Sequence, residues 1–162
     1  SYAVQLAKHI GAEVTGECST GKVDLVRLLG ADHVIDYTRE DFAAGGRRYD
    51  LIIDIAGNPP LSRLRRALTP TGTVVIVGAE NAGKLTGMTR QLGAALLSPF
   101  VGQRLTSVVS KEQFSVLERL RQLIEKGAVS PSIDLSYPLS QASDAMRRLA
   151  AGSVQGKVAI TI

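Results

Sequence analysis

Short apolar segments alternate with helical segments along the first half of the chain, and this alternation limits the fold more than any other feature. Four segments rich in Val and Ile are predicted strands: residues 13–18, 33–37, 51–55 and 73–78. Helical patterns at residues 23–29 and 61–68 separate them. The last two strands are continuously apolar, which is typical of parallel strands covered on both faces. The pattern predicts an α/β fold with a doubly wound parallel sheet.

The second half of the chain continues the mixture of helices and strands. A Ser-x-x-Gln pattern at residues 110–113 predicts a capping box that opens a helix ending at Gly127. An extended segment at 130–140, a helix at 141–151 and a last strand at 157–162 follow. The apolar stretch 92–97 can line a substrate pocket, form a contact in a homodimer, or pack in the core.

The chain begins inside a helical pattern, SYAVQLAKHI, with no capping residue or turn before it. Open parallel sheets bind ligands beyond the carboxyl ends of their strands. A dinucleotide site there also needs a glycine-rich phosphate loop, G-x-G-x-x-G, after the first strand. The chain contains no such loop, and we expect its place to be immediately before Ser1.

Composition excludes several classes of protein. Only 4% of the 162 residues are aromatic, so the core must be aliphatic. One Cys and two His are too few for the usual zinc-ligand cluster, so we expect this segment to bind no zinc. The single Cys fits a reducing compartment, and no leader or membrane-spanning apolar run is evident. We therefore expect a cytoplasmic protein with no membrane partner.

The net charge of +4 is a mild basic excess. Arginine pairs stand at residues 47–48, 65–66 and 147–148, each beside or within a helical pattern. No aromatic platform or basic stripe accompanies them, so solvated helix faces are favoured over nucleic-acid binding. An anionic small ligand would suit the charge equally well.

An ordered set of short motifs resembles the medium-chain dehydrogenase/reductase superfamily, most closely its quinone oxidoreductase-like and zinc-binding alcohol dehydrogenase-like branches. The motifs are SYAVQLAKHIGAEVTG, CST-K, LGADHVIDY, YDLIIDIAGN, LTPTGTVVIVG and the tail from IDLSYPLSQ to GKVAITI. The resemblance implies a Rossmann-like parallel sheet lacking its first strand. It implies a truncated NADP-binding domain at residues 1–130. Residues 131–162 would be a C-terminal segment whose strands pack on an absent N-terminal catalytic domain, leaving their apolar faces partly uncovered here.

The end of the second strand of such a domain selects the nicotinamide cofactor. NAD-dependent enzymes place an acidic residue there, whereas NADP-dependent enzymes use small polar and basic residues. The acidic position of the family matches Cys18, and Glu17 should point to the opposite face of the strand. We favour NADPH over NADH, with the predicted ligands of its 2′-phosphate and adenosine being Ser19, Thr20, Lys22 and Tyr37. The alternative is that residues 19–22 only cap the next helix, and capping and phosphate binding are compatible.

The resemblance implies five further cofactor-binding residues: Asn58, Gly78, Val108, Val109 and Lys157. Four of them have a structural alternative: Asn58 as a helix N-cap, Gly78 as a turn residue, and the two valines as core. No catalytic acid, base or metal ligand can be named, and a structural role is expected for Asp36, Asp50 and Asp54.

The favoured function is the NADPH-binding segment of an oxidoreductase, inactive by itself, whose parent moves hydride between NADPH and a quinone, enone or carbonyl/alcohol substrate. The alternative is a non-enzymatic nucleotide-binding or structural partner module. A methyltransferase is a third hypothesis, disfavoured by the final strand and by the missing acid at Cys18.

Overall fold

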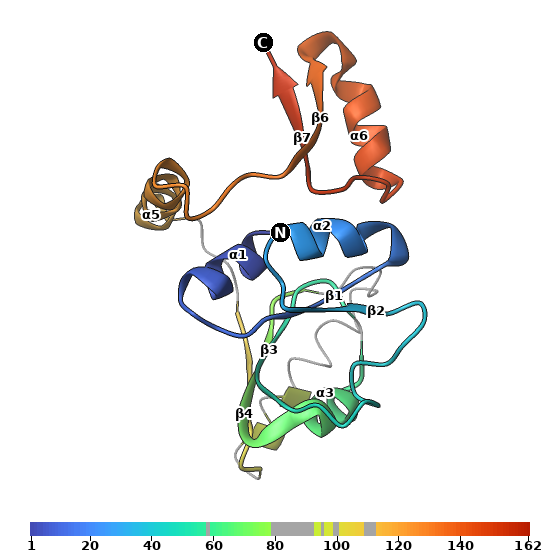
Figure 1. The fold of residues 1–162 in the computed structure, drawn as a ribbon, viewed down its shortest axis with the longest axis vertical. Helices are drawn as coiled ribbons and strands as arrows, with labels where there is room; N and C mark the ends of the chain where they lie inside the picture. Colours follow the sequence, from blue (N-terminus) through green and yellow to red (C-terminus); the bar gives the residue numbers. More distant parts are fainter. Residues whose placement is uncertain (58, 79–92, 95, 99–100, 109–112) are drawn as a thin grey trace. The chain divides into compact units, whose positions relative to one another are not determined.

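The computed structural model describes residues 1–57, 59–78, 93–94, 96–98, 101–108 and 113–162. It is an α/β protein, as predicted, and every strand pairing among the described residues is parallel (Figure 1). The strands of the described residues form three sheets, in the orders β1-β2, β3-β4-β5 and β6-β7. Two compact units emerge: residues 1–40 together with 113–162, and residues 41–112. None of the described helices is long and apolar enough to cross a bilayer.

The amino-terminal part of the first unit is a strand–helix–strand motif preceded by a helix. It comprises α1 (Tyr2–His9), β1 (Thr15–Cys18), a 3-10 turn (Thr20–Lys22), α2 (Val23–Leu28) and β2 (His33–Asp36). Helix α2 packs closely on β1: a β-carbon placed on Gly16 would come within 2.5 Å of Val26 Cγ1. Glycine at this position therefore lets the helix lie directly on the strand.

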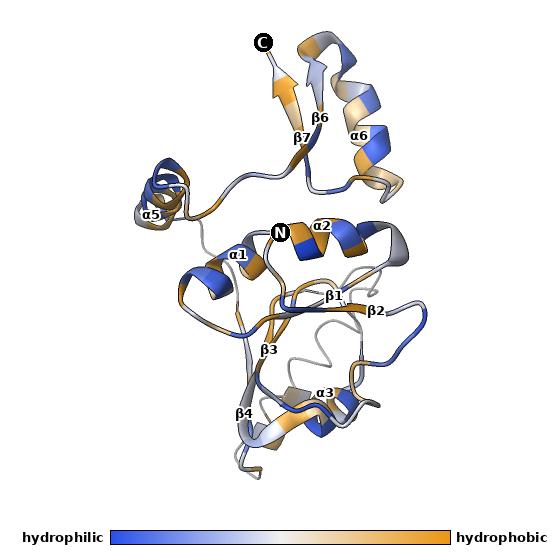
Figure 2. Ribbon diagram, viewed as in Figure 1, coloured by the Kyte–Doolittle hydropathy of each residue, from blue (hydrophilic) through white to orange (hydrophobic). Residues whose placement is uncertain are grey.

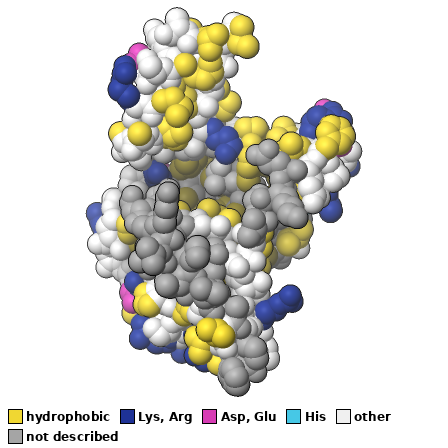
Figure 3. Space-filling view, turned by 180° about the vertical axis from the view of Figure 1, so that it is seen from behind, with side chains coloured by type: hydrophobic (Ala, Val, Ile, Leu, Met, Phe, Trp, Pro, Cys, Tyr) yellow, Lys and Arg dark blue, Asp and Glu magenta, His cyan; other side chains and the backbone are white. Residues whose placement is uncertain are grey.

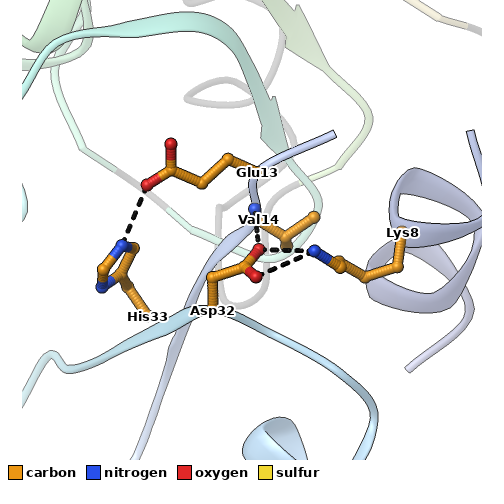
Figure 4. A network of polar contacts seen from close by, with 5 residues as sticks. All are labelled: Lys8, Glu13, Val14, Asp32 and His33. Atoms are coloured by element: carbon orange, nitrogen blue, oxygen red, sulfur yellow. Dashed lines mark hydrogen bonds and ion pairs between the residues drawn. The ribbon is translucent and has the colours of Figure 1, made fainter. Parts of the chain in front are cut away.

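A polar network joins α1 to the amino ends of β1 and β2 (Figure 4). Lys8 Nζ donates to both carboxylate oxygens of Asp32 at 2.8 Å, and the backbone N–H of Val14 donates to Asp32 Oδ2 at 2.7 Å. These bonds, first of all the one from Lys8, lower the pKa of the Asp32 carboxyl. Beside them, His33 Nε2 lies 2.9 Å from Glu13 Oε1. The network holds the residue before β2, Asp32, against the residue before β1, Val14, and so stabilises the pairing of the two strands.

The carboxyl-terminal part of the first unit contains α5 (Phe114–Glu125), β6 (Ile133–Pro138), a 3-10 turn (Leu139–Gln141), α6 (Ala142–Ala150) and β7 (Lys157–Thr161). Two reciprocal bonds join it to α1: Gln5 Nε2 donates to Ser130 O at 2.9 Å, and Ser130 N donates to Gln5 Oε1 at 2.7 Å. Hydrophobic side chains remain exposed on β6, β7 and α6, in the upper part of Figure 3, and include Ile133 and Ile160. The exposure predicted for these strands is observed.

Helix α5 begins differently from the prediction. Its N-cap is Gln113, which makes no side-chain capping bond, and the helix starts at Phe114. Residues 109–112, which include the predicted Ser110 cap, lie outside the described residues.

The second unit is built on β3 (Tyr49–Asp54), α3 (Leu61–Ala67), β4 (Leu68–Ile76) and β5 (Arg104–Ser107). Its core lies between the three-stranded sheet and α3 and consists of Leu64, Leu68, Val74, Ile76, Ala94 and Leu105. Phe42, Ile52, Leu61 and Val101 pack around this cluster.

One face of β3 departs from the prediction. The strand is largely hydrophobic (Figure 2), and both faces were expected to be covered. Instead Leu51 and Ile53, and Ile55 just after the strand, are 54%, 45% and 52% exposed. Between them, Ile52 packs against the core and Asp54 is buried. The reason is the alternation of side chains along a strand: within this unit, α3 covers one face of the sheet.

Candidate functional site

The carboxyl ends of β1 and β2 lie side by side, which places the predicted cofactor residues of the first unit at one edge. Cys18 pairs with Asp36 in the parallel register, and the backbone N–H of Tyr37 donates to Cys18 O at 3.1 Å. The segment Ser19–Lys22 and the segment Tyr37–Thr38 therefore leave the sheet as neighbours. This is the arrangement from which parallel sheets build ligand sites.

Asp36 connects these two segments. Its buried carboxylate accepts hydrogen bonds from Thr20 Oγ1 at 2.5 Å, from Thr38 Oγ1 at 2.7 Å and from the backbone N–H of Thr38 at 3.0 Å. Arg39 Nε lies 3.5 Å from the same group. The bond from Thr20, and next that from Thr38, lowers the pKa of the Asp36 carboxyl, because these donors stabilise its charged form. Asp36 thus has a structural role, in agreement with the expectation for this residue.

Because of these contacts, the hydroxyl proton of Thr20 is already donated to a hydrogen bond within the protein. A threonine hydroxyl has one proton to donate, and both Thr20 and Thr38 donate theirs to Asp36. Thr20 therefore lies at the predicted edge, but its proton is engaged inside the protein. A cofactor contact by Thr20 stays a prediction, and in this geometry it would be restricted to accepting a hydrogen bond.

Ser19, Lys22 and Tyr37 carry side-chain groups that bond to no other described residue. The backbone of Ser19 is extended, and its carbonyl accepts a 2.9 Å bond from the N–H of Lys22, which forms the tight 3-10 turn. Tyr37 is 58% exposed. A hydroxyl, an ammonium and a phenol thus remain available as donors near one edge of the small sheet.

The position expected to select the cofactor is occupied by a buried thiol. Cys18 is 9% exposed, and burial, together with the charge of Asp36, raises the pKa of its thiol. The preceding residue, Glu17, is exposed. The two side chains differ in burial, as the alternation along a strand predicts, and residue 18 itself carries no carboxylate.

A hollow of about 340 Å³ lies beside this edge, between α2 and β2. Its lining includes Thr20, Val23, Arg27, Asp36 and Arg39, but not Ser19, Lys22 or Tyr37. The three available donors therefore lie outside this hollow.

Gln155 is a residue that sequence reasoning missed. Its side-chain Nε2 donates to the carbonyl of Gly21 at 3.0 Å, so the loop before β7 holds the segment Ser19–Lys22 from the side. The two residues are 134 positions apart, and no local pattern marks the pairing. Lys157, two residues later, places its ammonium 4.3 Å from the ring centroid of Tyr2, a cation–π contact.

The predicted residues of the second unit follow the carboxyl ends of β4 and β5. A β-carbon on Gly78 would lie 2.8 Å from Ile55 O, so the close approach of two backbones by itself accounts for glycine there. Val108 follows β5, donates its N–H to Ile76 O at 3.0 Å and is 48% exposed. Asn58 and Val109 lie outside the described residues.

The donor set at the β1–β2 edge fits an anionic nucleotide better than a metal ion. In the described part of the chain, no group of three or more His, Cys, Asp or Glu side chains is placed to hold a metal. Lys22 instead offers a positive charge, and Ser19 and Tyr37 offer hydroxyl donors, which suit a phosphate or a ribose.

Comparison with known proteins identifies relatives of this chain. The model of a family described as "Zinc-binding dehydrogenase" matches residues 29–160. The chain is 33% identical over 170 residues to the chloroplast envelope quinone oxidoreductase homolog of Arabidopsis thaliana, covering 98% of this chain and 48% of that protein. It is 32% identical over 164 residues to the chloroplastic NADPH-dependent alkenal/one oxidoreductase of the same plant, covering 99% and 37%.

Comparison with solved structures identifies the same kind of protein. The quinone oxidoreductase from Coxiella burnetii superimposes with a TM-score of 0.80 at 26% identity, covering 99% of this chain and 48% of that one. The chain thus spans about half the length, or less, of these relatives.

Proposed function

Because the chain belongs to the zinc-binding dehydrogenase family, within the medium-chain dehydrogenase/reductase superfamily, we propose that it forms the NADPH-binding part of a reductase. The adenosine half of the nicotinamide cofactor would lie against the carboxyl ends of β1 and β2. The proposed substrates are quinones, enones or carbonyl compounds.

The observation that carries the proposal is the set of three available donors beside a position that lacks an acid. The buried thiol of Cys18 offers no carboxylate to a ribose 2′-hydroxyl. Next to it, Ser19 and Lys22 offer the hydroxyl and the cation that a 2′-phosphate requires, and the exposed Tyr37 offers a phenol and an aromatic face.

Each residue has a distinct part in the proposed binding. Lys22 neutralises the 2′-phosphate, Ser19 donates a hydrogen bond to it, and Tyr37 lies beside the adenosine. Asp36 positions both segments through Thr20 and Thr38 without contacting the cofactor. Gln155 supports Gly21, so the turn that carries Lys22 is held from two sides. When bound, the nicotinamide supplies the hydride, and the protein contributes binding and orientation.

The substrate class rests on the relatives. Two of them are named for quinones and for alkenals or alkenones, which share a conjugated, electron-poor π system able to accept hydride. Their names support a reductase of conjugated carbonyl compounds.

Binding and turnover test the proposal separately. NADPH and NADH are titrated by nucleotide fluorescence into the complete product of the gene, and NADPH oxidation is then followed with a panel of quinones, enones and aldehydes. Tighter binding of NADPH and turnover with a conjugated substrate are expected. Preference for NADH contradicts the cofactor assignment, and absence of binding contradicts the nucleotide site. NADPH binding without turnover across the panel favours the non-enzymatic nucleotide-binding module instead.

A further inference from the structure

Helix α3 has two faces of opposite character. Its inward face carries Leu64 and Ala67, which are 1% and 0% exposed. Its outward face carries Ser62, Arg65 and Arg66, which lie at helical spacing and so share one side of the helix. Together with Pro70 and the segment 101–103, these three residues line an open hollow of about 570 Å³. We call this hollow the α3 groove.

Arg65 is held in a fixed orientation within the α3 groove. Its Nε donates to Gln103 Oε1 at 3.1 Å, while Gln103 Nε2 donates to Arg65 O at 2.9 Å and to Thr69 O at 3.2 Å. The amide of Gln103 thus bonds both the side chain and the backbone of Arg65, and its second N–H bonds Thr69 O. The two terminal nitrogens of the guanidinium bond to no other described residue, so their N–H donors remain available.

The charge of the α3 groove is positive and poorly compensated. The nearest acid of Arg66 is Asp41, at 4.0 Å, the outer limit of an ion pair. Asp41 is already engaged by Arg63, whose Nε and Nη2 lie 2.9 Å and 2.8 Å from Oδ1. No acidic residue is among the described residues that line the groove. Two guanidinium groups therefore face an open hollow with a hydroxyl beside them.

We propose that the α3 groove is a binding site for a small molecule bearing a carboxylate or phosphate group. The fork of Arg65 suits the paired oxygens of such a group, and Arg66 and Ser62 add a second cation and a hydroxyl donor. Pro70 and Val101 offer an apolar wall to a short hydrocarbon body. The groove lies at the amino ends of β4 and β5, the opposite ends of these strands from Gly78 and Val108. The proposal is therefore independent of the nucleotide site.

Inorganic phosphate is the first probe. It is titrated into the ¹⁵N-labelled chain against sodium chloride of matched ionic strength, and the amide signals of Ser62, Gly102 and Gln103 and the Nε–H signal of Arg65 are followed. We expect saturable shifts of these signals with phosphate and not with chloride. Acetate, added as a second arm, competes if the site accepts carboxylates and leaves the phosphate shifts unchanged if the ligand must be a phosphate.

Two variants and one control decide the matter. Arg66→Ala removes a side chain whose nearest acid, Asp41, is 4.0 Å away. Arg65→Lys keeps the charge but loses the fork of the guanidinium. Each substitution should weaken phosphate binding about tenfold. Arg48→Ala makes the same change of charge as Arg66→Ala, but at an exposed arginine outside the groove. Its affinity for phosphate should stay within about twofold of that of the original protein. Shifts that chloride reproduces, or equal affinity in Arg66→Ala, Arg65→Lys and Arg48→Ala, would overturn the proposal.

Discussion

Thr20 Oγ1 lies 2.5 Å from Asp36 Oδ2, which ties the turn after β1 to the last residue of β2. The hydroxyl that sequence reasoning assigned to a cofactor phosphate is thus occupied by a buried carboxylate. Asp36 shapes the proposed site by holding the turn, while the available donors are those of Ser19, Lys22 and Tyr37. Residues that position the turn and residues proposed to contact the cofactor should therefore respond differently to substitution, even where they are neighbours.

The contribution of Asp36 to stability should depend on pH. Its carboxyl has a lowered pKa in the folded protein, so the stabilisation is present above the unfolded value of about 3.9 and disappears as pH falls through the lower folded value. Asp36→Asn should therefore lower the urea midpoint at pH 7, and the difference from the original protein should shrink toward pH 3. The measurement is a series of urea titrations from pH 7 to pH 3.

Asp24→Asn is the control for this series, because the Asp24 side chain is 99% exposed. It should follow the original protein across the range. A gap between Asp36→Asn and the original protein that stays constant from pH 7 to pH 3 would contradict the role given to the Asp36 charge.

Gln155 should affect cofactor binding without touching the cofactor. Removal of its bond to Gly21 O in Gln155→Ala loosens the turn that carries Lys22, and we expect NADPH to bind about two- to tenfold more weakly. Hydrogen exchange at the Lys22 amide, which donates to Ser19 O, should accelerate in the same variant. Gln122→Ala, on an exposed position of α5, is the matched control, and equal effects of the two substitutions would contradict the assignment.

Leu64 should dominate the stability of the second unit. The side chain is 1% exposed and packs in the cluster between α3 and the sheet, so Leu64→Ala removes buried methyl groups and leaves a cavity. We expect a loss of about 2–5 kcal/mol in the free energy of unfolding, measured by urea titration. Leu96→Ala, at a position of the same unit that is 71% exposed, should change it by less than about 0.5 kcal/mol. Comparable losses in both variants would show that the described core is not the one that holds this unit.

Much of the fold could be predicted from the sequence because its signals are local. Strand β1 ends at Cys18 as expected, and the burial of Cys18 beside an exposed Glu17 follows from strand periodicity. The strand predicted at residues 73–78 begins earlier in the structure: β4 starts at Leu68 and includes Gly72, where a β-carbon would meet Tyr49 O at 2.8 Å. A glycine can mark the end of a strand or a position inside a strand where two backbones approach closely, and the sequence alone does not distinguish these two cases.

The candidate site was less predictable because its decisive contacts are not local. The sequence places Ser19, Thr20 and Lys22 in one short segment. It does not show that the hydroxyl of Thr20 donates a hydrogen bond to Asp36, sixteen positions away. The contact of Gln155 with Gly21 spans most of the chain and has no signature in spacing or composition. Similarly, the apolar run of β3 does not indicate that Leu51 and Ile53 remain exposed, since burial depends on which face another element covers.

The ratio of the NADH to the NADPH dissociation constant, compared between the original protein and Lys22→Ala, tests the proposed cofactor site most directly. Lys22→Ala should weaken NADPH binding about ten- to a hundredfold, leave NADH binding within about twofold, and so collapse the ratio toward one. Lys126→Ala, an equal change of charge at an exposed residue after α5, should leave the ratio unaltered. An unchanged ratio in Lys22→Ala, or parallel weakening of both nucleotides, would contradict the assignment of the β1–β2 edge to the 2′-phosphate of NADPH.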